Sequence, residues 1–193
     1  MLFRSLLFSA TYPPGIEQLA AQFMREAHTV KTPKPEAAPR IAQRFYTIEP
    51  TQRLTMVARM LMHFRPTSTI AFCNTKQRCD ALVALLRAQG INALALHGDL
   101  EQRERDQVLV QFAHRSLSVL VATDLAARGL DIQELEAVIN VDIAPDPAVH
   151  VHRIGRTGRA GQSGLALSLA TMDEMGAVGR IEQYQGIESQ WYR

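Results

Sequence analysis

Two stretches in the second half of the chain carry apolar side chains at most positions. They read SVLVATD at residues 118–124 and AVINVDI at residues 137–143. A half-buried strand alternates apolar and polar residues, whereas a strand covered on both faces is apolar almost throughout. The chain is therefore expected to contain a parallel sheet with helices packed against both of its faces.

The rest of the main part of the chain alternates strand-like runs with helical segments. Strands and helices that alternate in this way form crossover units, in which neighbouring strands are parallel. We therefore expect an α/β domain with a doubly wound parallel sheet, whose ligands bind beyond the carboxyl ends of the strands. The expected strands are residues 40–48, 69–74, 91–98, 118–124, 137–143 and 164–170, and the expected helices are residues 54–64, 76–89, 102–113 and a segment after Met172.

A proline-rich segment near the start of the chain marks a domain boundary. Residues 32–40, TPKPEAAPR, contain three prolines and no large apolar side chain. Proline is excluded from the interiors of helices and sheets, so this segment is expected to be a semi-rigid linker. We interpret residues 1–31 as the remnant of a first domain and residues 41–193 as a second domain.

The segment before the linker combines a strand-like run, LLFSAT, with a helix that Pro14 can begin. Its apolar stripe includes Ile16, Leu19 and Phe23 at helical spacing. About thirty residues cannot bury such a stripe in a core of their own. We therefore expect the stripe to pack on the second domain, to pair with another copy through residues 13–24, or to be mobile.

The overall charge does not identify a ligand, because 21 basic residues against 19 acidic ones leave a net charge of only +2. Any anion site must come from local clustering of charge. Cys73 and Cys79 lie in one short stretch without a second ligand pair, which argues against a zinc site and favours a reducing cytoplasm. No apolar run approaches the ~18 residues of a membrane span, and the start lacks a signal-peptide cleavage pattern.

One stretch concentrates cations where the backbone is poorly suited to hold them. HRIGRTGRAG at residues 152–161 places Arg153, Arg156 and Arg159 at every third position, with glycines between them. In an ordinary helix the like charges would repel by roughly 0.2–0.5 kcal/mol per pair, and each interior glycine would cost about 1 kcal/mol. We therefore interpret the stretch, at a loop and a helix start, as a site for several phosphates rather than ordinary surface.

TDLAARGLDI at residues 123–132 follows one of the apolar strands. Thr123 and Asp124 either face a ligand at the sheet edge or cap the following helix. Gly129 permits a tight backbone turn, and Asp131 can accept a hydrogen bond from a sugar hydroxyl. Taken alone, this stretch favours the capping role.

HGDLEQRERD at residues 97–106 leaves two similar alternatives. Gly98 allows the backbone to approach a phosphate closely, and Gln102 and Arg105 share one face of the next helix. The ordinary alternative is a solvated face with pairs such as Glu101–Arg105.

FCNT ends another expected strand, and its Asn74 and Thr75 either bind a phosphate backbone or cap the next helix. His152 is an isolated histidine, for which a structural role is the simplest interpretation. The sequence shows neither a Ser-His-Asp arrangement nor a set of metal ligands.

Taken in order, these segments resemble the motifs of the DEAD-box family of ATP-dependent RNA helicases over nearly the whole chain. LLFSAT is similar to motif III, IAFCNT to motif IV, and HGDLEQRERD to the Gln-x-x-Arg element that follows. VATDLAARGLDI is similar to motif V and HRIGRTGRAG to motif VI. LHGDLEQRERDQ and VHVHRIGRTGRAG are most similar to a bacterial subgroup that acts on large-subunit ribosomal RNA.

The resemblance implies the second of two RecA-like domains and assigns roles by position. It implies that Arg156 and Arg159 reach the ATP γ-phosphate, with Arg159 as the arginine finger, and that Gly129 and Asp131 contact the nucleotide, Asp131 at the ribose. The residues implied to line the RNA backbone are Thr75, Gly98, Asp99, Arg105 and Thr123. The residues implied to act between the domains are Ser9, Thr11, His152 and Arg153.

The chain lacks the G-x-x-x-x-G-K-[ST] phosphate loop and an Asp-Glu-Ala-Asp segment. ATP with magnesium is therefore expected to bind mainly to a first domain that this chain lacks, and Met1 is interpreted as a start imposed by truncation. The expected partners are RNA, ribosomal RNA in particular, and that first domain, without a membrane, and the chain alone is expected to hydrolyse no ATP. The alternatives are a stand-alone module that binds RNA or a partner protein, and a DNA helicase of the wider superfamily.

Overall fold

The computed structural model describes residues 16–24, 28, 30, 41–128, 130, 132, 135–158 and 163–192. Its contacts divide the chain into one unit of residues 1–36 and a second of residues 37–193. The first unit contains α1 (Ile16–Phe23), at whose end Phe23 is 74% exposed. Ser9 and Thr11 lie outside the described residues, and the division into remnant, linker and second domain stays a prediction.

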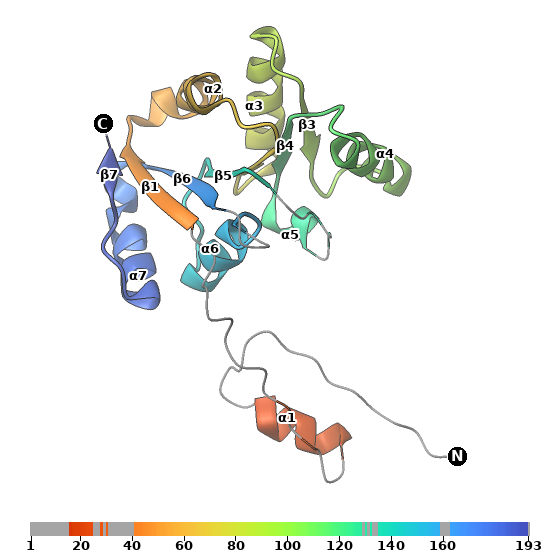
Figure 1. The fold of residues 1–193 in the computed structure, drawn as a ribbon, viewed down its shortest axis with the longest axis vertical. Helices are drawn as coiled ribbons and strands as arrows, with labels where there is room; N and C mark the ends of the chain where they lie inside the picture. Colours follow the sequence, from red (N-terminus) through yellow and green to blue (C-terminus); the bar gives the residue numbers. More distant parts are fainter. Residues whose placement is uncertain are drawn as a thin grey trace. The chain divides into compact units, whose positions relative to one another are not determined.

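The second unit is built on a seven-stranded sheet in which every pairing is parallel. The strand order is β3-β4-β2-β5-β6-β1-β7, and Figure 1 shows β3 and β4 at one side of the sheet and β1 and β7 at the other. This confirms the expected doubly wound parallel sheet, to which the structure adds the short edge strand β7. The strands are β1 (Ile41–Thr47), β2 (Thr69–Phe72), β3 (Ala93–Leu96), β4 (Val119–Ala122), β5 (Ala137–Asn140), β6 (Gly164–Ala170) and β7 (Trp191–Tyr192).

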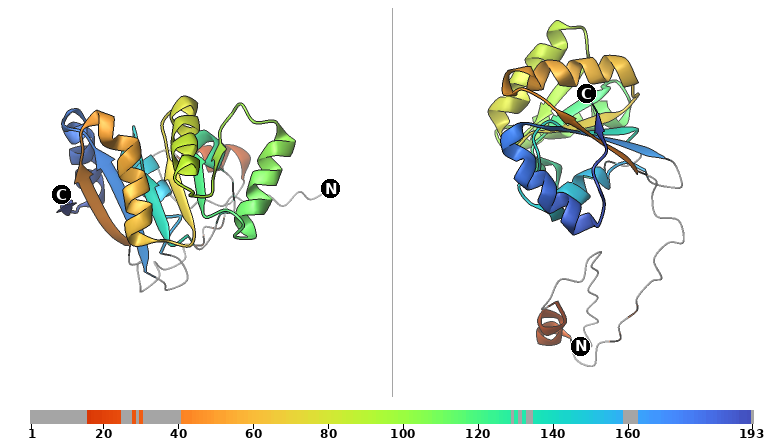
Figure 2. Two further views of the ribbon diagram at one scale, coloured as in Figure 1. Left: turned by 90° about the horizontal axis from the view of Figure 1, so that it is seen from above. Right: turned by 90° about the vertical axis from the view of Figure 1, so that its left-hand side faces the viewer.

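Helices cover both faces of this sheet because successive strand side chains point to opposite sides. In β4, Val121 packs with α2 and α3, whereas Leu120 packs with α4 and α5 on the other face. Figure 2 shows the sheet between α2 and α3 on one side and α7 on the other. The helices of this unit are α2 (Arg53–Phe64), α3 (Lys76–Ala88), α4 (Gln102–Ala113), α5 (Asp124–Ala127), α6 (Pro147–Ile154) and α7 (Met175–Gln185), with 3-10 turns η1 (Pro50–Gln52) and η2 (Met172–Glu174).

The arginine stretch lies at the end of a helix and not at its start, so this part of the sequence prediction was wrong. Asp146 caps the N-terminus of α6 by accepting a hydrogen bond from the backbone N–H of Ala148 at 2.7 Å. Pro147 occupies the first turn, where its missing N–H costs nothing. The helix then runs to Ile154 and ends in Gly155, so Arg153 belongs to its last turn.

The loops that follow the carboxyl ends of the central strands position the candidate site. The loop after β2 leads into α3, the turn after β3 into α4, and the loop after β5 into α6, while α5 follows β4 directly. Cys73 and Cys79 are buried free thiols beside the first of these loops. Among the helices in the described part of the chain, none is long and apolar enough to cross a membrane.

Candidate functional site

Arg153 lies in the interior of the domain, although its sequence motif suggests a surface cluster. Its side chain is 1% exposed and pairs with Asp124, the first residue of α5. Arg153 Nε donates to Asp124 Oδ1 and Nη2 donates to Oδ2, both at 2.7 Å. This two-point geometry is the strongest form of guanidinium–carboxylate pairing. Asp124 therefore neutralises a buried cation and does not cap α5.

The remaining donors of Arg153 join the ends of neighbouring strands. Its Nη1 donates to the backbone carbonyl of Asp142 at 2.8 Å, and its Nη2 donates to Asn74 Oδ1 at 2.9 Å. The guanidinium carbon also lies 5.1 Å from the centre of the Phe72 ring, within cation–π range. Arg153 thus ties α6 to the carboxyl ends of β2, β4 and β5. The role expected of Arg153 towards another domain stays a prediction.

Arg156 lies just beyond the end of α6 and turns towards the segment after α5. Its Nη1 donates to the carbonyl of Leu130 at 2.6 Å and its Nη2 donates to the carbonyl of Ala127 at 3.3 Å. The side chain is half-buried and lines a pocket of about 420 Å³ between α5 and α6. Of the other residues expected to bind the nucleotide, Arg159, Gly129 and Asp131 lie outside the described residues.

The described lining of this pocket is suited to an anion. Arg128, His152 and Arg156 contribute basic side chains, while the Asp124 carboxylate is already paired with Arg153. Planar guanidinium groups bind phosphate oxygens through parallel hydrogen bonds, and a partly buried site screens such contacts less than open solvent does. The basic side chains of the described lining therefore fit an anion such as a phosphate group.

Two loops expected to contact a nucleic-acid backbone are joined across the sheet edge. Lys76, at the start of α3, pairs with Asp99 after β3 at 2.6 Å. Helix α3 follows β2, and β4 lies between β2 and β3 in the sheet, so the pair spans one strand. The Lys76 hydrogen bond holds the pKa of Asp99 below its usual value. Gly98 is exposed, and a side chain built there would meet nothing within 4 Å. The pair thus brings the Thr75 and Gly98 loops together.

Thr75 is the N-cap of α3, because its Oγ1 accepts a hydrogen bond from the backbone N–H of Arg78 at 3.3 Å. The capping alternative for Thr75 is therefore confirmed, while its contact with RNA stays a prediction. The neighbouring Asn74 instead connects to Arg153 and donates from Nδ2 to the carbonyl of Ile143 at 3.1 Å.

The two polar residues expected on one face of α4 have different surroundings. Gln102 is exposed and donates to Asp106 Oδ1 at 2.7 Å, in keeping with a solvated face. Arg105 is half-buried and donates from Nη2 to the carbonyl of Ala126 in α5 at 2.5 Å. Thr123 precedes α5, and its side chain makes no capping hydrogen bond. Contacts of Arg105 and Thr123 with RNA stay predictions.

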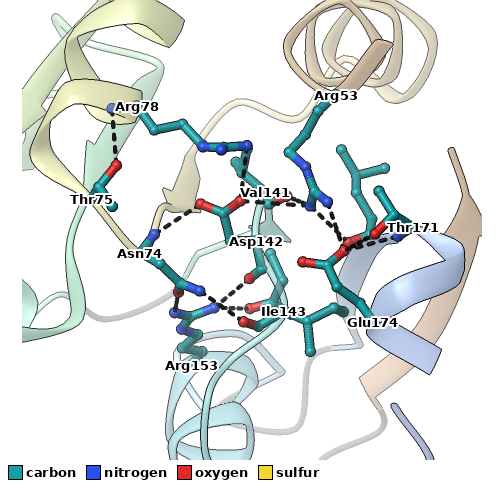
Figure 3. Close-up of polar contacts among 12 residues, drawn as sticks. Arg53, Asn74, Thr75, Arg78, Val141, Asp142, Ile143, Arg153, Thr171 and Glu174 are labelled. Atoms are coloured by element: carbon teal, nitrogen blue, oxygen red, sulfur yellow. Dashed lines mark hydrogen bonds and ion pairs between the residues drawn. The ribbon is translucent and has the colours of Figure 1, made fainter. Parts of the chain in front are cut away.

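Sequence reasoning missed a buried group of charges that adjoins Arg153 (Figure 3). Arg53, at the start of α2, pairs with Glu174 Oε2 at 2.6 Å and lies 3.6 Å from Asp142 Oδ1. Although burial raises the pKa of Glu174, the contacts with Arg53 and Thr171 together hold it below its usual value. Asp142 and Glu174 lie 89 and 121 residues after Arg53, so no local sequence pattern predicts these pairs. The sequence showed only an aspartate near the end of the apolar run at residues 137–143.

Comparisons with known proteins agree with this geometry. Residues 52–161 match the model of the helicase conserved C-terminal domain. The chain is 46% identical over 188 residues to the ATP-dependent RNA helicase DbpA of Escherichia coli K12, covering 97% of this chain and 41% of that protein. DbpA represents the bacterial subgroup that the sequences of the motifs at residues 96–107 and 149–161 resemble. The chain thus spans about two fifths of this relative.

Solved structures show the same fold. The Saccharomyces cerevisiae protein Dbp5 bound to RNA and ADP BeF3 matches with a TM-score of 0.83 and 30% identity, over 96% of this chain and 50% of that one. The E. coli DEAD-box protein SrmB bound to regulator of ribonuclease activity A matches with a TM-score of 0.76 and 29% identity, over 81% of this chain and 92% of that one.

Proposed function

Because the chain belongs to the helicase conserved C-terminal domain family, as a DEAD-box C-terminal domain, we propose that it is the second half of an ATP-dependent RNA helicase. Residues 41–193 would form the second RecA-like domain, residues 32–40 the linker and residues 1–31 the remnant of the first domain. The observation that carries this proposal is the basic pocket between α5 and α6, into which Arg156 faces.

In this proposal Arg156 and Arg159 serve ATP that another domain holds. ATP with magnesium would supply the transferable phosphoryl group and bind mainly through the first domain. The guanidinium of Arg156 is held in place by the carbonyls of Leu130 and Ala127, so it need not be reorganised to meet negative charge. Arg159 follows three residues later and would act as the arginine finger, with Gly129 and Asp131 at the nucleotide.

RNA would lie along the joined loops that follow β2, β3 and β4. Thr75, Gly98 and Asp99 lie on the two loops that the Lys76 pair connects. Phosphate and sugar contacts of this kind do not read the base sequence, and their affinity falls as salt rises. Arg105 and Thr123 would complete this surface, His152 would contact the first domain, and ribosomal RNA in a bacterial cytoplasm would be the substrate.

Reconstitution tests the proposal. The chain is mixed with a separately expressed first domain of DbpA, and ATP hydrolysis is measured with and without RNA. We expect turnover only in the mixture with RNA, and Arg159→Ala should lower it by about 10³–10⁵-fold, the range of arginine fingers in related phosphoryl transfer. Arg103→Ala, an exposed arginine on α4, is the matched control. Turnover by the chain alone, or full turnover with Arg159→Ala, would contradict the proposal.

A stand-alone binding module is the second candidate. It is favoured by the SrmB structure, in which a chain of similar extent is bound to a regulator protein. A module of this kind would bind RNA or a partner equally well with and without the first domain and ATP. Sedimentation of the chain alone would also show whether residues 13–24 pair two copies.

A further inference from the structure

Asp142 occupies the centre of the buried charge group and holds the loop that follows β2. It is the second residue after the end of β5 and is 5% exposed. Its Oδ2 accepts a hydrogen bond from the backbone N–H of Asn74 at 2.9 Å, and its Oδ1 lies 3.1 Å from Arg78 Nη1. Figure 3 shows the carboxylate between the loop and Arg53. One side chain from the loop after β5 is therefore attached both to the loop after β2 and to helix α3.

These two points lie on either side of Thr75. Asn74 precedes it, and Arg78 follows it by three residues and donates its backbone N–H to Thr75 Oγ1. Asp142 thus restrains the chain before Thr75 and the first turn of α3 after it. Thr75 itself is exposed, and the attachments of the Asp142 carboxylate are to Asn74 and Arg78. Asp142 can therefore set the position of Thr75 without meeting anything that Thr75 binds.

The carboxylate of Asp142 is itself held from behind. Arg53 is buried, with Nη1 donating to the carbonyl of Val141 at 2.6 Å and Nη2 to Glu174 at 2.6 Å. Arg153 donates to the backbone carbonyl of Asp142 at 2.8 Å. Arg53 Nη1 also lies 3.6 Å from Asp142 Oδ1, so the Asp142 side chain faces a guanidinium that other partners hold in place.

We infer that Asp142 is a positioning residue that sets Thr75 against the RNA backbone. The inference rests on the proposed function, because it takes RNA as the ligand of the Thr75 loop. A hydroxyl contributes to phosphate binding only when it is held within about 0.5 Å of its productive position. The two attachments to Asp142 supply that restraint across the loop.

The direction in which Asp142→Asn changes RNA affinity distinguishes a positioning role from a simple effect of charge. Removal of a carboxylate raises the positive charge of the domain and, by charge alone, strengthens the binding of an anionic RNA. Loss of a positioning contact weakens binding instead. Asp142→Asn therefore has opposite expected effects under the two explanations.

The test measures binding of fluorescein-labelled decauridylate to the 193-residue chain by anisotropy at low salt. We expect Thr75→Ala and Asp142→Asn each to weaken binding by about three- to tenfold, the value of one hydrogen bond. The double variant should bind no more weakly than Thr75→Ala, within about twofold. Asp142→Glu, which keeps the carboxylate, should stay within about twofold of wild type. Glu188→Gln, on the exposed loop before β7, controls for the lost charge.

A second variant keeps the test valid if Asp142→Asn does not fold. Arg78→Lys preserves the charge of a side chain that is 40% exposed but loses the guanidinium that faces Asp142. It should weaken binding by about twofold, and only when Thr75 is present.

Three outcomes would overturn the inference. If folded Asp142→Asn binds RNA as well as or better than wild type while Thr75→Ala weakens binding, the positioning role of Asp142 is refuted and the proposed function is not. Additive losses in the double variant refute action through Thr75. A wild-type chain that binds no RNA, even with the first domain and ATP, refutes the proposed function and this inference together.

Discussion

Breaking the Arg153–Asp124 pair should destabilise this domain, and by unequal amounts from the two sides. Asp124→Asn leaves a guanidinium whose side chain is 1% exposed without its neutralising carboxylate. Loss of one partner of a buried ion pair typically costs about 3–5 kcal/mol of unfolding free energy. We expect Asp124→Asn to fall in that range.

Arg153→Met should lower the unfolding free energy by less, because the Asp124 carboxylate that it leaves unpaired is easier to accommodate than a buried guanidinium. The Asp124 side chain is 24% exposed and can regain water once Arg153 is gone. Methionine retains an apolar contact with Phe72, but the carbonyl of Asp142 loses its 2.8 Å donor. An unsatisfied buried acceptor costs about 1–3 kcal/mol, so we expect a total loss of about 2–3 kcal/mol.

Urea unfolding of the chain at pH 7, followed by far-UV circular dichroism, measures both values. The unfolding midpoint should shift while the slope with urea stays constant, because the surface exposed on unfolding does not change. The double variant should lose less than the sum of the single losses, since its two partners are in contact. Arg103→Met, on the exposed face of α4, should stay within about 0.5 kcal/mol of wild type.

The assay contains no first domain, so any loss reports contacts inside this domain. If Arg153→Met and Asp124→Asn both stayed within about 1 kcal/mol of wild type, the pair would not hold the ends of β2, β4 and β5 together. If Arg153→Met were the more damaging change, burial of the uncompensated charge would not be the dominant cost.

Two further predictions concern buried positions. Burial, with a smaller effect of nearby Arg153, lowers the pKa of His150 from 6.5 to about 4. The unfolded chain therefore binds this proton first as pH falls, so stability should be full above pH 6.5 and decrease by up to about 1.4 kcal/mol per unit down to about pH 4. Urea midpoints between pH 7 and 4.5 check this, and His150→Phe should flatten the decrease. Gly164→Ala would place a Cβ 2.4 Å from the backbone nitrogen of Gly158 and 2.5 Å from Thr157 Oγ1, so β6 must shift. A loss of about 1–3 kcal/mol is expected, and a thermal melt equal to wild type would show that the start of β6 moves freely.

Most of the sheet could be predicted, because strands β1 to β6 each correspond to a local sequence pattern. Residues 118–124 and 137–143 gave β4 and β5 from their apolar runs alone. The start of α6 was missed because the helix start was placed at the arginine stretch, although Asp146 followed by Pro147 is a recognised helix start. Edge strand β7 has only two residues, which is too short for a periodic signal.

Within the candidate site, the sequence could predict only interactions between residues that are close together in the chain. The capping of α3 by Thr75 is local and was among the stated alternatives. The pairs Arg53–Asp142 and Arg153–Asp124 form between segments that are distant in the sequence. The sequence around an aspartate does not indicate which distant arginine it will pair with. Asp142 was therefore invisible as a positioning residue until β2 and β5 were seen to be neighbours.

The end of α6 also explains how the chain tolerates closely spaced arginines. Repulsion would be costly if Arg153 and Arg156 projected from one helical surface, but the helix ends at Ile154, between them. Arg153 turns inward to a carboxylate, and Arg156 turns to the carbonyls beyond α5. The first cation is neutralised within the domain, so it adds little field to the pocket. The regular spacing of the motif therefore conceals two different surroundings, a buried carboxylate for Arg153 and the backbone carbonyls beside the pocket for Arg156.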